Sequence, residues 1–127
     1  MQDNHLFEYA AIRIVPRVER EEFLNVGVIL YCKKLKFLQA MITIDEERLR
    51  VFSGYLDMEE LKAYLHAFEQ ICLGDKAGGP IARLDIASRF RWLTATRSTI
   101  LQTSKVHTGL CGNAAEMLIR IHTQLVL

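Results

Sequence analysis

Two stretches of the sequence concentrate the residues that could take part in chemistry. The first is IRIVPRVEREEFLNVGVIL and the second is TATRSTILQTSKVHTG. An arginine pair with an amide, a hydroxyl and an imidazole can hold a phosphate through charge-assisted hydrogen bonds, and a nearby carboxylate or imidazole can act as a base. The same residue types also form ordinary ion-pair networks, so we assign no catalytic residue. The candidate binding patch consists of Arg13, Glu22, Asn25, Gly27, Arg97, Ser98 and His107.

Asn25 and Gly27 interrupt an apolar run, FLNVGVILYC, that otherwise predicts a buried strand. Both residue types are depleted in strand interiors. Because side chains alternate along a strand, we expect Asn25 and Gly27 to share one sheet face with Phe23, Ile29 and Tyr31. The remaining leucines and valines of the run would then form the core face, which the helices cover.

Pairing of the first two strands predicts Arg13 opposite Asn25 and Ala11 opposite Gly27. The face away from the helices would then carry a shallow dip at Ala11 and Gly27, beside the polar pair. Such a dip lets another backbone or a ligand approach closely. Two occupants fit it: the chain's own second stretch, with Arg13 paired to Glu22, or a ligand such as a nucleotide.

The elements that must position these residues follow from hydrophobic period and from capping residues. Apolar runs predict strands over residues 7–15, 23–32 and 36–44, joined by short connections that favour an antiparallel meander. A later strand is predicted over residues 98–103. Helices are expected after the N-cap residues Asp45, Asp57, Asp85 and Asn113. These elements predict a single domain over residues 1–127, of α+β class, with a small antiparallel sheet and helices packed on one face.

Composition limits the compartment and the cofactors. The chain has 127 residues and a net charge of +1, which favours neither a polyanion binder nor a membrane-surface protein. No apolar run approaches the length of a membrane span, and the first residues do not resemble a signal peptide, so we expect a cytoplasmic protein. Three scattered cysteines fit a reducing compartment, and His107 with Cys111 supplies at most half of a metal site. We expect no metal and no cofactor.

A basic run in the second half of the chain supports a nucleic-acid interpretation. Arginine and aromatic residues together can contact phosphates and stack on bases. Against this stand the pI of about 7.8 and the lack of a recognised nucleic-acid fold signature. Phe90 and Trp92 cannot both face one side of a helix, so we expect one of them in the core. The run comprises Arg83, Arg89, Arg91, Arg97 and Lys105, interleaved with Phe90 and Trp92.

Together the two stretches resemble the bacterial family catalogued as domain of unknown function 3037 (DUF3037). The resemblance covers nearly the whole chain, with departures at Thr96 and Thr108, at or near positions where members often carry proline. It implies no established activity, but it implies a partner role beside a kinase-like protein that resembles the HipA toxin family. The family pattern falls on Arg13, Pro16, Glu22, Asn25, Gly27, Phe90, Trp92, Arg97, Ser98, His107 and Gly109.

Three functions are therefore consistent with the sequence. The first is a non-catalytic protein-interaction module that binds another bacterial protein, such as the HipA-like kinase. The second is a nucleic-acid or nucleotide and phosphate binder that uses the basic half of the chain. The third is a phosphate-ester enzyme built on Arg13 and Asn25, with Glu22 or His107 as its base.

Overall fold

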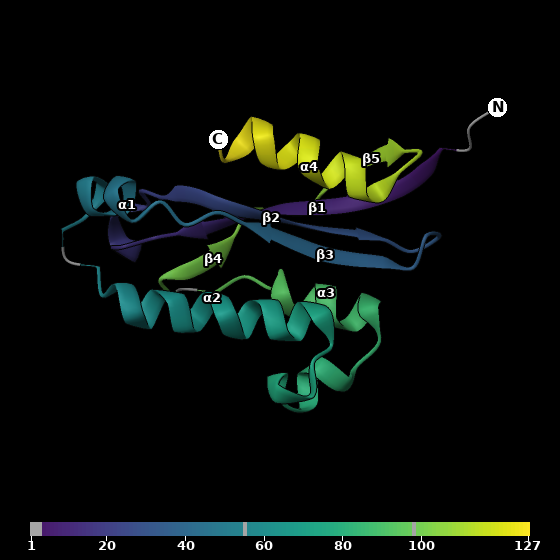
Figure 1. Cartoon of the computed structure of the whole chain (residues 1–127), viewed down its shortest axis with the longest axis horizontal. Coiled ribbons are helices and arrows are strands. Elements are labelled where there is room, and N and C mark those ends of the chain that lie inside the picture. The colour runs from purple at the N-terminus through teal and green to yellow at the C-terminus, as the bar shows by residue number, and fades with distance from the viewer. Residues whose placement is uncertain (1–3, 55, 98) are drawn as a thin grey trace.

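The computed structural model describes residues 4–54, 56–97 and 99–127. Figure 1 shows a sheet that lies between helices. The strands are β1 (His5–Ile14), β2 (Leu24–Cys32), β3 (Phe37–Ile42), β4 (Leu101–Thr103) and β5 (His107–Cys111). The helices are α1 (Glu46–Phe52), α2 (Met58–Leu73), α3 (Ile86–Leu93) and α4 (Ala114–Leu125), with short 3-10 turns at Val18–Arg20, Lys76–Gly78 and Pro80–Arg83. The predicted α+β class is confirmed.

The sheet is antiparallel throughout, in the order β3-β2-β1-β4, and β5 also pairs with β1. The N-terminal meander and the later strand are both confirmed, although β4 is shorter than predicted. Strand β5 was not expected, because the sequence pattern predicts no strand after residue 103. β4 and β5 pair with opposite ends of β1: Ile14 faces Leu101, and Tyr9 faces His107.

Ser104 joins β4 and β5 along the edge of β1. Its amide donates to the carbonyl of Ala11 at 2.9 Å, and its Oγ accepts from the Ala11 amide at 2.9 Å. The same hydroxyl donates to the carbonyl of Lys105. A buried side chain therefore continues the ladder where the strand is interrupted, and no backbone amide of β1 is lost at that point.

Helices cover both faces of the sheet, so the predicted single helical face is wrong. In Figure 1, α4 lies on one side of the sheet, and α2 and α3 lie on the other. The α4 face buries Phe7, Val28 and Leu30 under Leu118 and Ile121 of the helix. Both faces of β1 and β2 are apolar, and each requires a cover to remove it from water.

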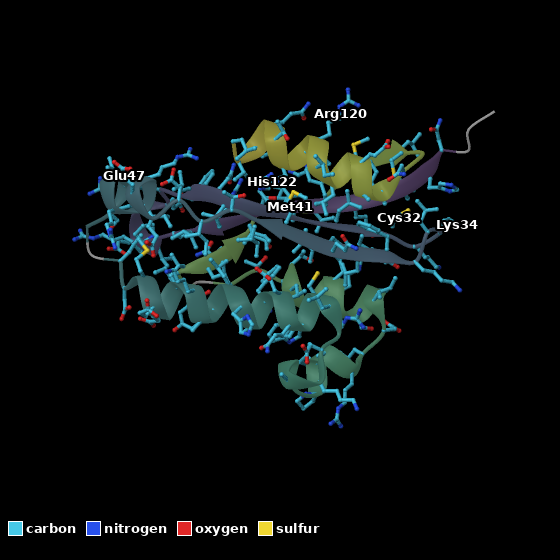
Figure 2. The ribbon with its side chains drawn as sticks, in the orientation of Figure 1. Cys32, Lys34, Met41, Glu47, Arg120 and His122 are labelled. Atoms are coloured by element: carbon cyan, nitrogen blue, oxygen red, sulfur yellow. The ribbon has the colours of Figure 1, made fainter. Side chains whose placement is uncertain are left out.

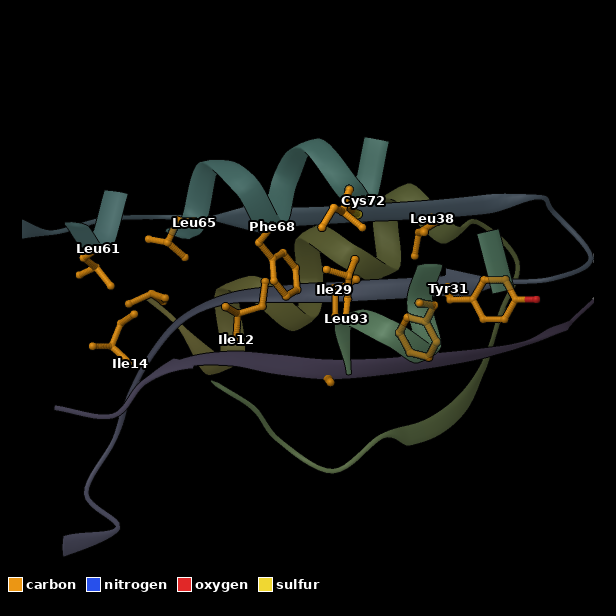
Figure 3. Close-up of a cluster of buried hydrophobic side chains, with 14 of the residues drawn as sticks. Ile12, Ile14, Ile29, Tyr31, Leu38, Leu61, Leu65, Phe68, Cys72 and Leu93 are labelled. Carbon is orange, nitrogen blue, oxygen red and sulfur yellow. The ribbon is translucent and has the colours of Figure 1, made fainter. Parts of the chain in front are cut away.

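The larger core lies beneath α2 and α3 (Figure 3). The apolar stripe of α2 buries Leu61, Leu65 and Phe68 against Ile12 and Ile29 of the sheet. The prediction that the sheet face with Ile29 is left uncovered by helices is therefore also wrong, because Ile29 lies within this core. A fully buried large aliphatic side chain contributes about 1.5–3 kcal/mol relative to exposure, so this cluster is a major source of stability.

Each predicted N-cap residue caps its helix. The carboxylates of Asp45, Asp57 and Asp85 accept from backbone amides of α1, α2 and α3, and Asn113 does the same for α4. Gly74 ends α2 with φ of 73°, a left-handed conformation that glycine adopts at no steric cost. These helix starts follow from local sequence alone, because a cap satisfies amides within its own turn.

A β-bulge in β2 alters the predicted register. Arg13 faces Asn25 as expected, but Ile12 faces Gly27, which leaves Val26 as an extra residue on β2. Ala11 therefore faces Val28 and not Gly27, contrary to the prediction. The extra residue reverses the alternation of side chains, so Asn25 lies on the α4 face while Val26 joins the α2 core.

Candidate functional site

Arg13 lies near the end of β1, where the bulge and β4 meet. Its guanidinium carbon lies 3.8 Å from the centroid of the Phe23 ring, so the side chain stacks on an aromatic face. Its Nε is buried and has no hydrogen-bond partner among the described residues. Burial lowers the pKa of Arg13, because removal from water disfavours the charged form. A cation held in this way has free donors and incomplete solvation.

Arg97 reaches the same region from the segment that follows α3. Its guanidinium carbon lies 4.3 Å from the centroid of the Trp92 ring, and Nη1 donates to the carbonyl of Leu93 at 3.3 Å. Nη2 donates to the carbonyl of Trp92. Burial lowers the pKa of Arg97 as it does that of Arg13. The helix-end carbonyls and the indole ring therefore fix where this guanidinium lies.

The two arginines line one cavity of about 390 Å³, which we call the arginine pocket. Among the described residues, no ion pair joins either arginine to a carboxylate. Glu21 belongs to the lining, so two cations face one anion and the pocket is positively charged. Its residues are Arg13, Val15, Val18, Glu21, Phe23, Arg97 and Gln102.

An apolar hollow of about 310 Å³, the aromatic groove, lies beside the arginine pocket, and Arg97 lines both. Gln102 lines the pocket and its neighbour Leu101 lines the groove, because successive strand residues point to opposite faces. Trp92 is 41% exposed at the groove. The groove is lined by Tyr64, Ala67, Phe68, Ile71, Trp92, Leu93, Arg97, Thr99, Ile100 and Leu101.

These two hollows can bind an anion together with an apolar group. Guanidinium groups present planar pairs of donors that match carboxylate and phosphate oxygens. The aromatic groove can take an apolar side chain or a flat ring, since hydrophobic and aromatic walls with few polar groups are typical of ligand sites. The arrangement favours recognition over bond-breaking chemistry.

Asn25 of the predicted patch has a structural contact. Its Nδ2 donates to the carbonyl of Leu125 at 3.2 Å, near the end of α4. Arg48 donates to the next carbonyl, that of Val126, at 3.0 Å. These donors satisfy carbonyl groups that a helix end leaves unpaired. Asn25 therefore ties α4 to the sheet.

Gly27 is required by the packing of the chain against itself. A Cβ at this position would lie 2.8 Å from the carbonyl oxygen of Met41 and 2.9 Å from Cγ1 of Ile42. The group that approaches Gly27 closely is therefore the neighbouring strand β3. The dip predicted as a docking surface at Gly27 is occupied by the chain's own residues, and Gly27 does not share a face with Asn25.

The remaining patch residues lie apart from the arginine pocket. Glu22 forms its ion pair with Arg20. His107 faces Tyr9 on β1, with ring centroids 5.3 Å apart, and the strand rise places it roughly 13 Å along β1 from Arg13. Ser98 lies outside the described residues. Neither predicted base is brought to the arginine pair by any contact in the described part of the chain.

Two arginines of the basic run are held by contacts within the chain. Arg91 makes a bidentate pair with Glu8, at 2.9 and 3.2 Å, and this hydrogen bonding raises the pKa of Arg91. Arg89 donates to the carbonyl of Leu84. Phe90 is fully buried while Trp92 is half-exposed, which confirms that one of the two aromatic residues belongs to the core.

Sequence reasoning missed Phe23 and Gln102 as neighbours of Arg13. Gln102 faces Arg13 across the β1–β4 pair, and only that register could have revealed it. Phe23 lies immediately before β2, where its ring can reach the cross-strand neighbour of Asn25. A signal for it existed, because diagonal neighbours on a sheet lie within reach of aromatic side chains.

Comparison with known proteins gives a family but no function. The model of the family described as "Protein of unknown function (DUF3037)" matches residues 9–126. The chain belongs to the DUF3037 family. No curated protein and no solved structure matches it. Among the described residues of this DUF3037 protein, no helix is long and apolar enough to cross a membrane, and no group of three His, Cys, Asp or Glu side chains is placed to hold a metal ion.

Proposed function

We propose that this DUF3037 protein is a non-catalytic interaction module that binds an acidic segment of a partner protein in the arginine pocket. The observation that carries the proposal is that Arg13 and Arg97, each stacked on an aromatic ring, line one pocket. Among the described residues, neither forms an ion pair with a carboxylate. Arg13 and Arg97 are partly buried and therefore partly desolvated, and a partner carboxylate would supply the missing counter-charge.

The aromatic groove extends the proposed contact beyond the anion. Arg97 lines both hollows, so a segment with its carboxylate in the pocket can place an adjacent apolar side chain beside Trp92. Tryptophan and arginine are the residue types that most often dominate binding energy at protein interfaces. The proposed recognition element is therefore an acidic residue followed or preceded by a bulky apolar one.

A HipA-like kinase is the proposed partner, which rests on the family resemblance. The pocket supports an interaction role because its donors are arranged to hold an anion, and neither of the predicted bases, Glu22 and His107, contacts these donors in the described part of the chain. A phosphate-ester enzyme needs a base within hydrogen-bond reach of the reacting group or one water away. Glu22 pairs with Arg20 and His107 stacks on Tyr9, so the enzyme interpretation has less support.

The deciding experiment is affinity capture from a lysate of the source organism with three immobilised forms of the protein. Wild type and Arg120→Gln should retain the same partner, because Arg120 is exposed on α4 and points away from the sheet in Figure 2. The Arg13→Gln/Arg97→Gln variant should lose it at unchanged melting temperature. Equal capture by that variant would contradict the proposal.

Phosphate or nucleotide binding is a second candidate, which the half-exposed ring of Trp92 beside Arg97 favours. Stacking on an aromatic ring contributes about 1–3 kcal/mol for each base. The chain has one tryptophan, so its fluorescence reports on this site without labelling. Titration with inorganic phosphate and with mononucleotides would favour this candidate if Trp92 responds and the response disappears in Arg97→Gln.

A further inference from the structure

The outer edge of β3 is open for strand pairing. β3 is the last strand of the sheet on its side, and among the described elements none pairs with its outer edge. In Figure 1, β3 lies between α4 and α2, and no described ribbon crosses in front of it. This edge lies across the sheet from β4 and the arginine pocket, so it is independent of the proposed function.

The backbone groups that face outward can be assigned from one hydrogen bond. The amide of Thr43 donates to the carbonyl of Val26 at 2.8 Å, so Thr43 directs its backbone groups toward β2. In an antiparallel sheet, alternate residues direct these groups to opposite neighbours. Leu38, Ala40 and Ile42 therefore present their N–H and C=O groups at the open edge.

The edge has none of the features that normally prevent strand pairing. Proteins protect edges with charged residues, proline, bulges or very short strands. β3 has the sequence FLQAMI, which contains no charge and no proline, and its pairing with β2 is regular over all six residues. An unprotected edge of this length is a pairing site for another strand.

Opposite charges flank the two ends of this edge. The β2–β3 hairpin that precedes β3 carries Lys34 and Lys36, while the start of α1 that follows β3 carries Glu47 and Glu46, the latter in an ion pair with Lys62 of α2. Figure 2 shows Lys34 and Glu47 at opposite ends of the sheet. An antiparallel partner with the same sequence reverses this order, so each basic end meets an acidic end.

We propose that two copies of this protein associate through antiparallel pairing of their β3 edges, which forms one continuous sheet. The register with Ala40 facing Ala40 of the partner subunit uses all three outward residues. Leu38 then faces Ile42 of the partner subunit, and the three bonded pairs supply about six hydrogen bonds. A closed two-fold contact of this kind is the commonest form of self-association.

An exposed leucine near the proposed axis supports a second copy as the occupant. Leu73, at the end of α2, is 70% exposed and lines a small cavity with Gln39, Ala40, Glu69 and Cys72. The two-fold axis through Ala40 places the two copies of this cavity next to each other. The dimer would therefore cover apolar surface as well as backbone groups, since Ala40 is small enough to allow close approach.

Sedimentation of the full chain over a range of concentrations tests the proposal. Wild type should show a reversible monomer–dimer equilibrium. The variants Lys34→Glu/Lys36→Glu and Glu47→Lys should each raise the dimer dissociation constant by at least about tenfold, because like charges then meet at both ends. Glu46 is left unchanged because its carboxylate pairs with Lys62 of the same chain. A mixture of the two variants should recover the affinity of wild type, since every charged contact in the mixed dimer is again attractive. Circular dichroism melting of each variant checks that it is folded.

Hydrogen exchange distinguishes this edge from the other edge of the sheet. The amides of Leu38, Ala40 and Ile42 should become protected as the protein concentration rises. A wild-type chain that stays monomeric up to its solubility limit would overturn the proposal. So would a dimer that is unaffected by the charge reversals, or one that protects amides of β5 in place of β3. If the β3 amides become protected only when a different protein is added, the proposal is also overturned, because that protein and not a second copy then occupies the edge.

Discussion

Replacement of Gly27 by alanine gives a direct test of how the bulge is packed. The new Cβ would lie 2.8 Å from the carbonyl oxygen of Met41, 2.9 Å from Ile42 Cγ1 and 3.2 Å from Ile12 Cδ1. The first of these contacts is with backbone inside a paired strand, so it cannot be relieved by a rotamer change. Strand β3 would have to shift away from β2.

The expected loss of stability follows from two opposing effects. Overpacking costs about 1–3 kcal/mol, and restriction of the unfolded chain returns about 0.4–1 kcal/mol. The two ranges combine to a net loss of about 0–2.6 kcal/mol, and their midpoints predict that Gly27→Ala lowers the free energy of unfolding by about 1.3 kcal/mol. For a chain of this size each kcal/mol lowers the melting temperature by about 3–6 °C.

Gly54→Ala is the matched control for this measurement. Apart from its chain neighbours, no described residue has a heavy atom within 4 Å of a Cβ at Gly54, so we expect the unfolded-state effect to dominate there. The melting temperature of Gly27→Ala should therefore fall, whereas that of Gly54→Ala should rise or stay unchanged. A Gly27→Ala protein as stable as wild type would show that Gly27 is not held against β3, and the register at the bulge would have to be revised.

Three further predictions concern single buried groups. Ser104→Ala should destabilise the protein by about 1–3 kcal/mol in chemical denaturation, because the buried Ala11 amide loses its acceptor. Thr43→Val should cost a similar amount, about 1–3 kcal/mol, because the buried His122 ring loses the hydroxyl that lies 2.9 Å from its Nε2; an unchanged denaturation midpoint would contradict it. Burial raises the pKa of Cys72 to about 12, so the folded state holds this proton more tightly than the unfolded state. Stability should fall as the pH rises from about 9 toward 12, and Cys72→Val should flatten that decline.

Local features of this fold were predictable from the sequence. The N-caps Asp57 and Asn113 and the stop at Gly74 depend on contacts within one helical turn, so residue type and spacing determine them. The apolar stripe of α2 likewise follows from its helical period. The side of the sheet on which a helix packs was not predictable, because an amphipathic stripe shows only which face of the helix is buried. Thus α4 was predicted as a helix but placed on the wrong face.

The candidate site was only partly predictable for a related reason. The prediction of Arg13 opposite Asn25 is confirmed, because pairing outward from the loop reaches these residues before the bulge. Beyond Asn25 the extra residue Val26 shifts the register, and simple alternation cannot reveal it. Gly27 was therefore interpreted as a surface dip, although its lack of a side chain is required inside the sheet.

The bulge also explains why the Phe23 ring lies beside Arg13 in the lining of the arginine pocket. Val26 and Gly27 are consecutive residues on the same face, where a Cβ at Gly27 would meet the Met41 carbonyl oxygen and Ile12 Cδ1. The amide of Val15, like that of Ala11, is directed away from β2, and it donates to the carbonyl of Ile100 at 2.7 Å. That bond draws the segment after α3 toward the end of β1, so that Arg97 and Arg13 line one cavity. Without the bulge Arg13 would face Val26, and the side chains of Phe23 and Asn25 would fall on the α2 face, so the bulge brings the Phe23 ring to the Arg13 guanidinium.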